Sequence, residues 1–249
     1  MHIPVTIAAL VLAVTYAAGQ PTPADRERAR IQNRLGWENM RAEQFEQAVK
    51  AFQQAIGIDP EFDYAYYGLG RAHMALKQYE SAISALTRCS EIHVALAGRS
   101  YANVQDAQRA RNDRIVQIDE QIRMVQAMPP TAQRQDELRQ LQNTRRDMQE
   151  AIQRGNSADL QARVPAYVML SLGSANFRAG RLADAERAYK DTIAADDRSG
   201  EAHNNLAVVY LMTGRYADAE RSIAAAKKVG FRVNPQLEAD IKAKKKAGS

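Results

Sequence analysis

The sequence offers few residue arrangements that could perform catalysis. Its four histidines are His2, His73, His93 and His203. None has a partner at the spacing of a metal-binding motif, and neither HExxH nor CxxC is present. A GxSxG nucleophile elbow and a glycine-rich phosphate loop are also missing from the sequence. We therefore expect a protein that is not an enzyme and has no cofactor or metal; an enzyme of unrecognised type is the remaining alternative.

The single cysteine, Cys89, excludes an intrachain disulfide. It lies among Ala85, Leu86 and Ile92 in a helical pattern. A free cysteine in such a setting behaves as a small buried hydrophobe, and a reactive thiol is the alternative.

The elements around these residues are defined by an internal repeat. GRLADAER at 180–187 returns as GRYADAER at 214–221, which is a step of 34 residues. The same skeleton occurs in segments 34–52, 68–86, 171–189 and 205–223. Each segment has a small residue in a first helix, an alanine in a second helix and a large apolar residue four positions later. These are Gly36, Gly70, Gly173 and Ala207; Ala48, Ala82, Ala185 and Ala219; and Phe52, Leu86, Tyr189 and Ile223.

Small residues on both helices allow two antiparallel helices to approach closely, and such a thin pair must stack on neighbours to bury its apolar face. The pattern resembles the tetratricopeptide repeat family, whose period is about 34 residues. The resemblance implies an all-α fold, a TPR-like α-solenoid of four helix-hairpin repeats, with repeats 1–2 over 29–96 and repeats 3–4 over 163–231. Only the first repeat keeps the closing proline, Pro60, and Val94, Asp197 and Phe231 stand at that place in the others.

The segment 97–162 does not fit the repeat and has a heptad pattern instead. Apolar residues recur at steps of three and four, and Pro129 and Pro130 end the first run. The seam residues are Ile115, Ile118, Ile122 and Val125, then Leu138, Leu141, Met148 and Ile152. We expect a long antiparallel coiled-coil hairpin that protrudes as an arm from one continuous solenoid. Two separate two-repeat modules are the alternative.

The polar face of this arm mixes both signs of charge. Arg111, Arg114 and other arginines alternate with acidic residues such as Glu137. Together with a net charge of only +5, this mixture indicates a solvated surface rather than a nucleic-acid interface. We expect no nucleic-acid partner.

The two ends of the chain differ from its body. Residues 1–19 contain no Lys, Arg, Asp or Glu and end in small residues, which predicts a signal peptide cleaved before Gln20. An uncleaved membrane anchor is the alternative. Residues 20–28 read as a linker, and 232–249 as a basic capping helix in which Leu237 and Ile241 cover the last repeat. The protein is expected to be exported, to a bacterial periplasm; its lysine-rich tail is either solvated or in contact with an anionic surface.

The family resemblance implies a concave groove, lined by the first helix of each repeat, that holds an extended peptide or a partner helix. Trp37, the only tryptophan, would lie beside two tyrosines and Arg71, and such residues dominate peptide-binding hot spots. Asn33 and Asn204 would hold the backbone amides of a ligand. Helical spacing assigns to the groove Arg30, Asn33, Trp37, Arg41, Tyr64, Tyr67, Arg71, Met74, Tyr167, Ser174, Phe177 and Asn204. In the alternative, these aromatics pack between repeats or under the arm.

The sequence therefore predicts an exported, non-catalytic protein-interaction scaffold that binds a protein or peptide partner in its groove, with the arm as a second contact. The alternative is a structural protein that self-associates into a homo-oligomer through the arm.

Overall fold

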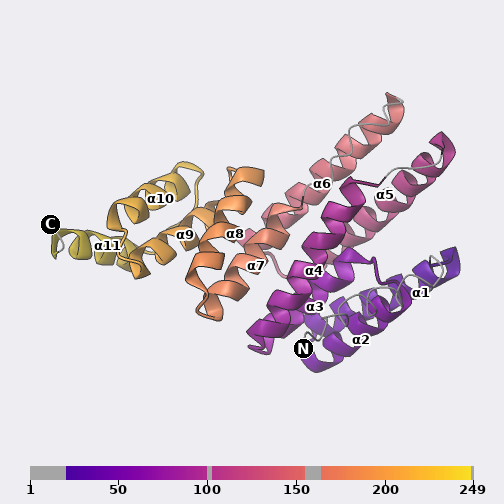
Figure 1. Ribbon diagram of the computed structural model, residues 1–249, viewed down its shortest axis with the longest axis horizontal. Helices are drawn as coiled ribbons and strands as arrows, with labels where there is room; N and C mark the ends of the chain where they lie inside the picture. The colour runs from indigo at the N-terminus through magenta and orange to yellow at the C-terminus, as the bar shows by residue number, and fades with distance from the viewer. Residues whose placement is uncertain (1–20, 100–102, 155–163, 248–249) are drawn as a thin grey trace, which may run out of the picture.

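The computed structural model describes residues 21–99, 103–154 and 164–247. Over these ranges the chain forms eleven α-helices and no strands. Figure 1 shows how the helices are arranged. The predicted all-α solenoid is confirmed. The expected signal peptide, residues 1–19, lies outside the described residues.

Eight helices form four antiparallel pairs. The pairs are α1 (Pro23–Arg41) with α2 (Phe45–Ile58), α3 (Asp63–Ala75) with α4 (Tyr79–Ala97), α7 (Ala166–Arg178) with α8 (Leu182–Ala195), and α9 (Gly200–Met212) with α10 (Tyr216–Lys228). Each pair corresponds to one repeat of the sequence.

The small residues of the repeat set the spacing within each pair. A Cβ added to Gly36 would stand 2.5 Å from the ring of Phe52, and one added to Gly70 would stand 2.6 Å from Leu86 Cγ. In the third repeat, the same addition to Gly173 would come within 2.6 Å of Tyr189. Because these distances are shorter than van der Waals contact, only glycine permits the observed approach.

The turn inside each repeat uses one residue with positive φ, at the same register every time. Gly180 and Gly214 occupy it with φ of 78° and 75°, whereas Glu43 and Lys77 occupy it with φ of 58° and 60°. Glycine takes this conformation at no steric cost, so the third and fourth repeats have the less strained turns.

The repeats stack into one solenoid. Helix α2 packs on α3, α4 on α7 and α8 on α9, so the third repeat follows the second in space although the hairpin separates them in sequence. Tyr167 and Val168 of the third repeat belong to the same apolar cluster as Phe52 of the first. The helix α11 (Pro235–Ala247) packs on α10 at the end of the row and buries Ile241, which is 1 % exposed.

The remaining helices, α5 (Val104–Gln126) and α6 (Ala132–Gln153), form a hairpin. The N-cap of α6 is Thr131, whose hydroxyl accepts a hydrogen bond from the Arg134 amide at 3.2 Å. A supercoiled seam between α5 and α6 remains a prediction. The expected protruding arm is instead packed against the repeats, because Glu137 of α6 accepts hydrogen bonds from Tyr64 and Tyr67 of α3, and Arg114 of α5 donates to Asp63 of α3.

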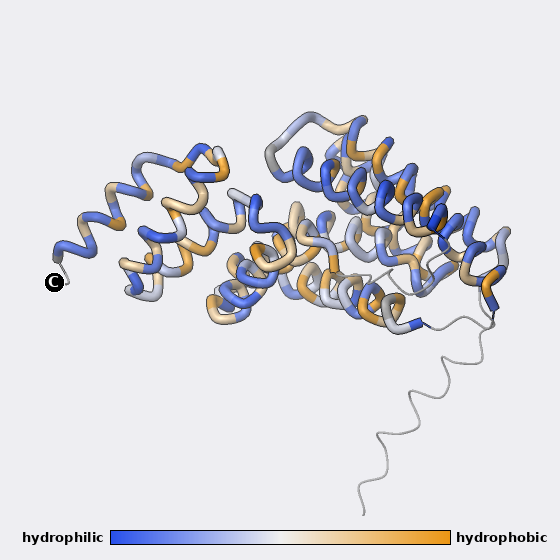
Figure 2. The backbone as a smooth tube through the Cα atoms, turned by 90° about the horizontal axis from the view of Figure 1, so that it is seen from above, coloured by the Kyte–Doolittle hydropathy of each residue, from blue (hydrophilic) through white to orange (hydrophobic). Residues whose placement is uncertain are grey.

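Only one end of the hairpin extends past the neighbouring helices, where α5 begins and α6 ends, as Figure 1 shows. Hydrophobic and hydrophilic residues alternate along the turns of most helices, as the colours in Figure 2 show. None of the helices in the described ranges is long and apolar enough to span a membrane.

Candidate functional site

The aromatic residues predicted for the groove form one cluster. The ring of Trp37 stacks on Tyr64 at 5.1 Å between centroids and meets the edge of Phe52 at 5.4 Å. Tyr67 packs edge-on against Tyr167 at 5.0 Å. The structure therefore brings together four of the predicted residues, from α1, α3 and α7.

This cluster is covered by the hairpin of the same chain. Tyr64 and Tyr67 donate hydrogen bonds to the two carboxylate oxygens of Glu137 in α6, at 3.3 and 3.2 Å. Arg71 donates to the Tyr67 hydroxyl at 2.8 Å. Glu137 is 2 % exposed and Tyr67 is fully buried, so solvent does not reach this contact.

The low polarity around these groups changes their protonation. Burial raises the pKa of Glu137, although Arg71 and the two tyrosine hydroxyls act in the opposite direction. Burial and the nearby Glu137 carboxyl raise the pKa of Tyr64 well above its ordinary value. The tyrosine hydroxyls therefore remain protonated donors over the whole accessible pH range.

A buried charged group joins the other hairpin helix to the repeats. Arg114 of α5 donates two hydrogen bonds to the Asp63 carboxylate, at 2.6 and 3.0 Å, and His93 Nε2 lies 3.1 Å from the same carboxylate. Burial opposes ionisation of Asp63, but Arg114 outweighs it and holds the pKa of Asp63 at about 2. Burial also lowers the pKa of His93 to about 4, so this ring is neutral at physiological pH.

Further polar contacts continue along the hairpin. They are Arg26 to Asp113 at 3.2 Å, Arg34 to Glu120 at 3.7 Å, Gln133 to Ser171 at 3.3 Å, the Tyr167 amide to Gln140 at 3.2 Å and Arg139 to Asp196 at 2.7 Å. The hairpin thus contacts α1, α3, α7 and the end of α8, which covers the inner face of the first three repeats.

The sequence interpretation of the arm's polar face as solvated is wrong for part of that face. Arg111 is 7 % exposed and Glu137 is 2 % exposed, and the side chain of Arg114 is 22 % exposed. The heptad pattern describes only the face between α5 and α6, whereas the groove buries a second face whose residues are polar. The sequence analysis did not predict that these polar hairpin residues are buried against the repeats. The signal that could have indicated it was the tyrosine-rich helix of the second repeat, whose hydroxyl groups could donate hydrogen bonds to a carboxylate of the arm.

The other predicted groove residues are dispersed. Asn33 is 1 % exposed, Arg30 pairs with Glu27 at 2.9 Å, Arg41 is exposed, and Met74 packs against the aromatic cluster. Three residues lie further along the solenoid: Ser174 accepts from Tyr189 at 3.4 Å, Phe177 packs in the core cluster of the last two repeats, and Asn204 donates to Asn205 at 3.4 Å. The alternative that the aromatics pack under the arm agrees with the arrangement in the first three repeats.

The contact between α1 and α5 contains buried polar atoms without a partner. Asn33 Oδ1 and Trp37 Nε1 on α1 and Gln121 Oε1 on α5 have no hydrogen bond to any described residue. Each such atom costs about 1–3 kcal/mol. The hairpin is therefore held less well on α1 than on α3, where Tyr64, Tyr67 and Asp63 are all partnered.

A pocket of about 420 Å³ opens at this weaker contact. Trp37 forms part of its wall, two methionines give it an apolar surface, and charged side chains surround it. The lining residues are Arg34, Trp37, Glu38, Arg41, Glu120, Arg123, Met124, Ala127 and Met128. The pocket suits a short segment that combines an apolar side chain with polar backbone groups.

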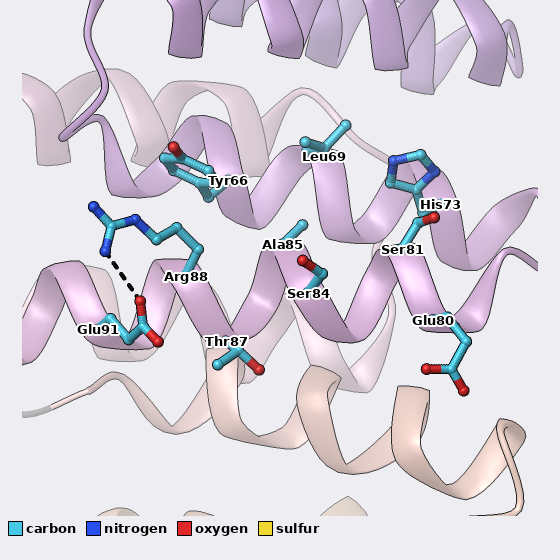
Figure 3. Close-up of a pocket in the computed structure, with 10 residues that line it drawn as sticks. All are labelled: Tyr66, Leu69, His73, Glu80, Ser81, Ser84, Ala85, Thr87, Arg88 and Glu91. Carbon is cyan, nitrogen blue, oxygen red and sulfur yellow. Dashed lines mark hydrogen bonds and ion pairs between the residues drawn. The ribbon is translucent and has the colours of Figure 1, made fainter. Parts of the chain in front are cut away.

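A second, more open pocket of about 750 Å³ lies along α3 and α4, as Figure 3 shows. Tyr66, Leu69 and His73 line it from α3, and serine, threonine and charged residues line it from α4. Its charged residues include the exposed pair Arg88–Glu91 at 3.0 Å. Within the described ranges no group of three or more His, Cys, Asp and Glu residues is placed to hold a metal ion.

Two tetratricopeptide repeat family models match the chain, at residues 39–95 and 170–230. Among solved structures, PilW, a type IV pilus biogenesis factor, is 16% identical over 87% of this chain and 85% of its own, with a TM-score of 0.41. A thermophilic TPR protein of Thermus thermophilus, TTC0263, is 18% identical over 87% and 98%, with a TM-score of 0.35. YrrB, a TPR protein with an unusual peptide-binding site, is 14% identical over 95% and 98%, with a TM-score of 0.30. No curated protein matches the chain.

Proposed function

Since the chain belongs to the tetratricopeptide repeat family, we propose that it is an exported, non-catalytic scaffold that binds a peptide segment of another protein. The binding place is the pocket between α1 and α5, beside Trp37. The observation that carries the proposal is that Trp37, whose buried Nε1 has no hydrogen-bond partner among the described residues, forms part of the wall of this pocket.

A peptide backbone could supply a hydrogen-bond partner that this contact lacks. A carbonyl oxygen of the peptide can accept a hydrogen bond from Trp37 Nε1. An apolar side chain of the same peptide would contact Met124 and Met128 in the pocket wall. Because a backbone carbonyl would make the contact with Trp37, that contact would not depend on the identity of the peptide residue.

The first test is capture of partners from an envelope extract, followed by identification with mass spectrometry. Reversal of the pocket arginines, Arg41→Glu with Arg123→Glu, should abolish recovery of the partner because it changes the rim of the pocket. The matched control, Arg178→Glu with Arg187→Glu, changes two exposed arginines of the third repeat by the same net charge and should leave recovery unchanged. Equal recovery of the partner with both pairs of variants would show that the partner does not bind at the pocket.

The second test uses the single tryptophan as a reporter. A synthetic peptide of the captured segment should change Trp37 fluorescence in a saturable manner, since Trp37 lies in the pocket wall. The Arg41→Glu, Arg123→Glu variant should require at least about tenfold more peptide, which corresponds to about 1.4 kcal/mol. A change in fluorescence that is identical in this variant would place the peptide elsewhere.

We propose that the protein is exported, because the apolar segment 1–19 resembles a signal peptide. Mass spectrometry of the protein from its native host should give Gln20 as the first residue of a periplasmic species. Recovery of Met1 from the membrane fraction would favour the uncleaved anchor instead.

Self-association through the arm receives less support. Ile118 and Val125 of the expected seam are buried within one chain, and Ile115 and Ile122 pack partly buried against the same cluster. Little of the seam is therefore available to a second hairpin. Sedimentation equilibrium of a variant with Lys in place of the exposed hairpin residues Val104 and Val116 tests this alternative without deleting the hairpin that covers the groove.

A further inference from the structure

One face of α1 is exposed although the same face is covered in every later repeat. Ile31 is 48% exposed and Leu35 is 43% exposed. In repeats 2 to 4 this face packs on the second helix of the preceding repeat. The equivalents of Ile31 are Ala65, Val168 and Ala202, all 0% exposed.

The opposite end of the solenoid is closed differently. Helix α11 packs on α10 there and covers it with Leu237 and the buried Ile241. Among the described helices, none covers the exposed face of α1 in this way. The first repeat therefore presents an apolar strip at the place where a preceding helix would pack.

The residues along this strip have the spacing of a coiled-coil seam. Six exposed positions of α1 and its C-cap follow one another at steps of 4, 3, 4, 3 and 4 residues. They are Ala24, Arg28, Ile31, Leu35, Glu38 and Ala42. Steps of four and three keep these side chains on one face of a helix over about 27 Å. The groove residues Trp37 and Asn33 lie on a different face, and the hairpin leaves Ile31 and Leu35 of the strip exposed.

The order of the residues is complementary to itself when reversed. The position numbers of each symmetric pair sum to 66, so an antiparallel second copy places alanine on alanine, Ile31 on Leu35 and Arg28 on Glu38. A two-fold axis near Asn33 would repeat each contact twice. Small residues at both ends let the helices approach, and the charges favour this register over neighbouring ones.

We propose that α1 is a homodimerisation surface, on which a second copy of this chain binds antiparallel through this six-residue strip. The occupant is a second copy because the strip offers each of its residues a chemically matched counterpart in itself. The inference does not require peptide binding at the pocket, although Glu38 of the strip also lines that pocket. With two apolar contacts and two exposed ion pairs, the dimer is weak, with a dissociation constant of roughly 10–100 µM.

The test is sedimentation equilibrium of the full chain over a concentration series, combined with reversal of the strip charges. Arg28→Glu places two acidic residues opposite each other at both ends of the strip, and Glu38→Arg places two basic ones. Each single variant should raise the dissociation constant by at least about tenfold. Both changes suit the helix dipole of α1, since they add an acid near its start and a base near its end, so the helix itself is retained.

The decisive experiments restore opposite charges across the dimer interface. The double variant Arg28→Glu, Glu38→Arg should dimerise within about threefold of the original chain, and an equimolar mixture of the two single variants should form heterodimers in preference to either homodimer. Lys substitution of the exposed hairpin residues Val104 and Val116 is the control, and it should leave the mass unchanged.

Three outcomes would overturn the proposal. The first is a monomer up to millimolar concentration, as expected if another part of the chain covers the strip. The second is a dimer that the single charge reversals do not weaken. The third is a dimer lost only in the Val104→Lys, Val116→Lys variant, which would assign assembly to the arm.

Discussion

At the scale of single residues, the repeats depend on positions where one methyl group decides the packing. Gly36 and Gly68 both face the ring of Phe52, which fills the space between the first two repeats. Gly57, in contrast, has no atom within 4 Å of the place where a Cβ would be. Chemically identical substitutions therefore have opposite expected effects in the same repeat.

Gly36→Ala should lower the free energy of unfolding by about 1–2 kcal/mol, because the strain against Phe52 exceeds the gain in helix propensity. Gly57→Ala should raise it by about 0.5 kcal/mol through propensity alone. Urea unfolding followed by circular dichroism measures both. A stabilised Gly36→Ala variant would contradict the close approach of α1 and α2.

The carboxylate of Asp63 is the second decisive residue. Asp63→Asn keeps the size of the side chain but removes the charge that Arg114 and His93 surround. Since an uncompensated guanidinium remains largely buried, we expect a loss of about 3 kcal/mol. Asp184→Asn, whose partner Arg187 is exposed, should change the free energy by less than about 0.5 kcal/mol. Equal small effects would show that the Asp63 group does not hold the hairpin.

At the scale of elements, the hairpin α5–α6 occupies the face that the repeats would otherwise offer to a ligand. It is held by Glu137 from one helix and Arg114 from the other, and both contacts end on α3. The contact with α1 is less complete, so this is where movement of the hairpin would begin. Because Trp37 lies next to the hairpin, its fluorescence reports docking.

Glu137 makes hairpin docking dependent on pH. Its pKa is raised in the folded state, so its contribution to stability is fully present below the unfolded value near 4.5 and is lost as the pH rises through the folded pKa. Thermal unfolding of the original chain should therefore show a smaller stability at pH 8 than at pH 5, relative to Glu137→Gln, which does not titrate. Asp63 does not contribute to this difference, since its pKa of about 2 lies below the window.

The measurement is the melting temperature at pH 5 and pH 8 for the two proteins, with Trp37 fluorescence as the signal. Parallel pH dependence in both would mean that Glu137 is solvated and that the hairpin does not bury it. Other carboxyls with raised pKa, such as Glu201 and Asp136, are common to both proteins and cancel in the comparison.

At the scale of the whole molecule, each repeat of the solenoid is stabilised mainly by contacts with the adjacent repeats. The first three repeats and the hairpin share one core cluster, whereas the last two repeats and α11 share another, so the third repeat contributes to both. A loss at the α11 end should therefore remain local.

Ile241→Ala should destabilise the fourth repeat by about 2–4 kcal/mol, because it empties a fully buried site between α11 and α10. Hydrogen exchange should accelerate in α9, α10 and α11 and stay unchanged in α1 to α4. Met212→Ala, at a position 60% exposed, is the control and should change neither. Acceleration that spreads evenly over all repeats would contradict the nearest-neighbour picture.

The repeat pattern was sufficient to predict most of the fold. Gly36, Gly70 and Gly173 recur at the same position of the repeat, and the reason for glycine there, close approach of two helices, is a local property that sequence expresses directly. The aromatic members of the groove were also predicted, since Trp37, Tyr64, Tyr67 and Tyr167 follow from helical spacing. What could not be predicted is that Glu137 and Arg114 face these residues, because both belong to a segment with its own, different periodicity.

By itself, the sequence determined the helices and their pairing within each repeat, because both depend on residues at most 34 positions apart. Tertiary structure alone decided where the hairpin lies. Its heptads are satisfied equally well whether it projects into solvent or folds back, and only the match of two buried polar groups with partners 51 and 73 residues away selects the folded-back position. That choice decides which part of the groove is open to a partner.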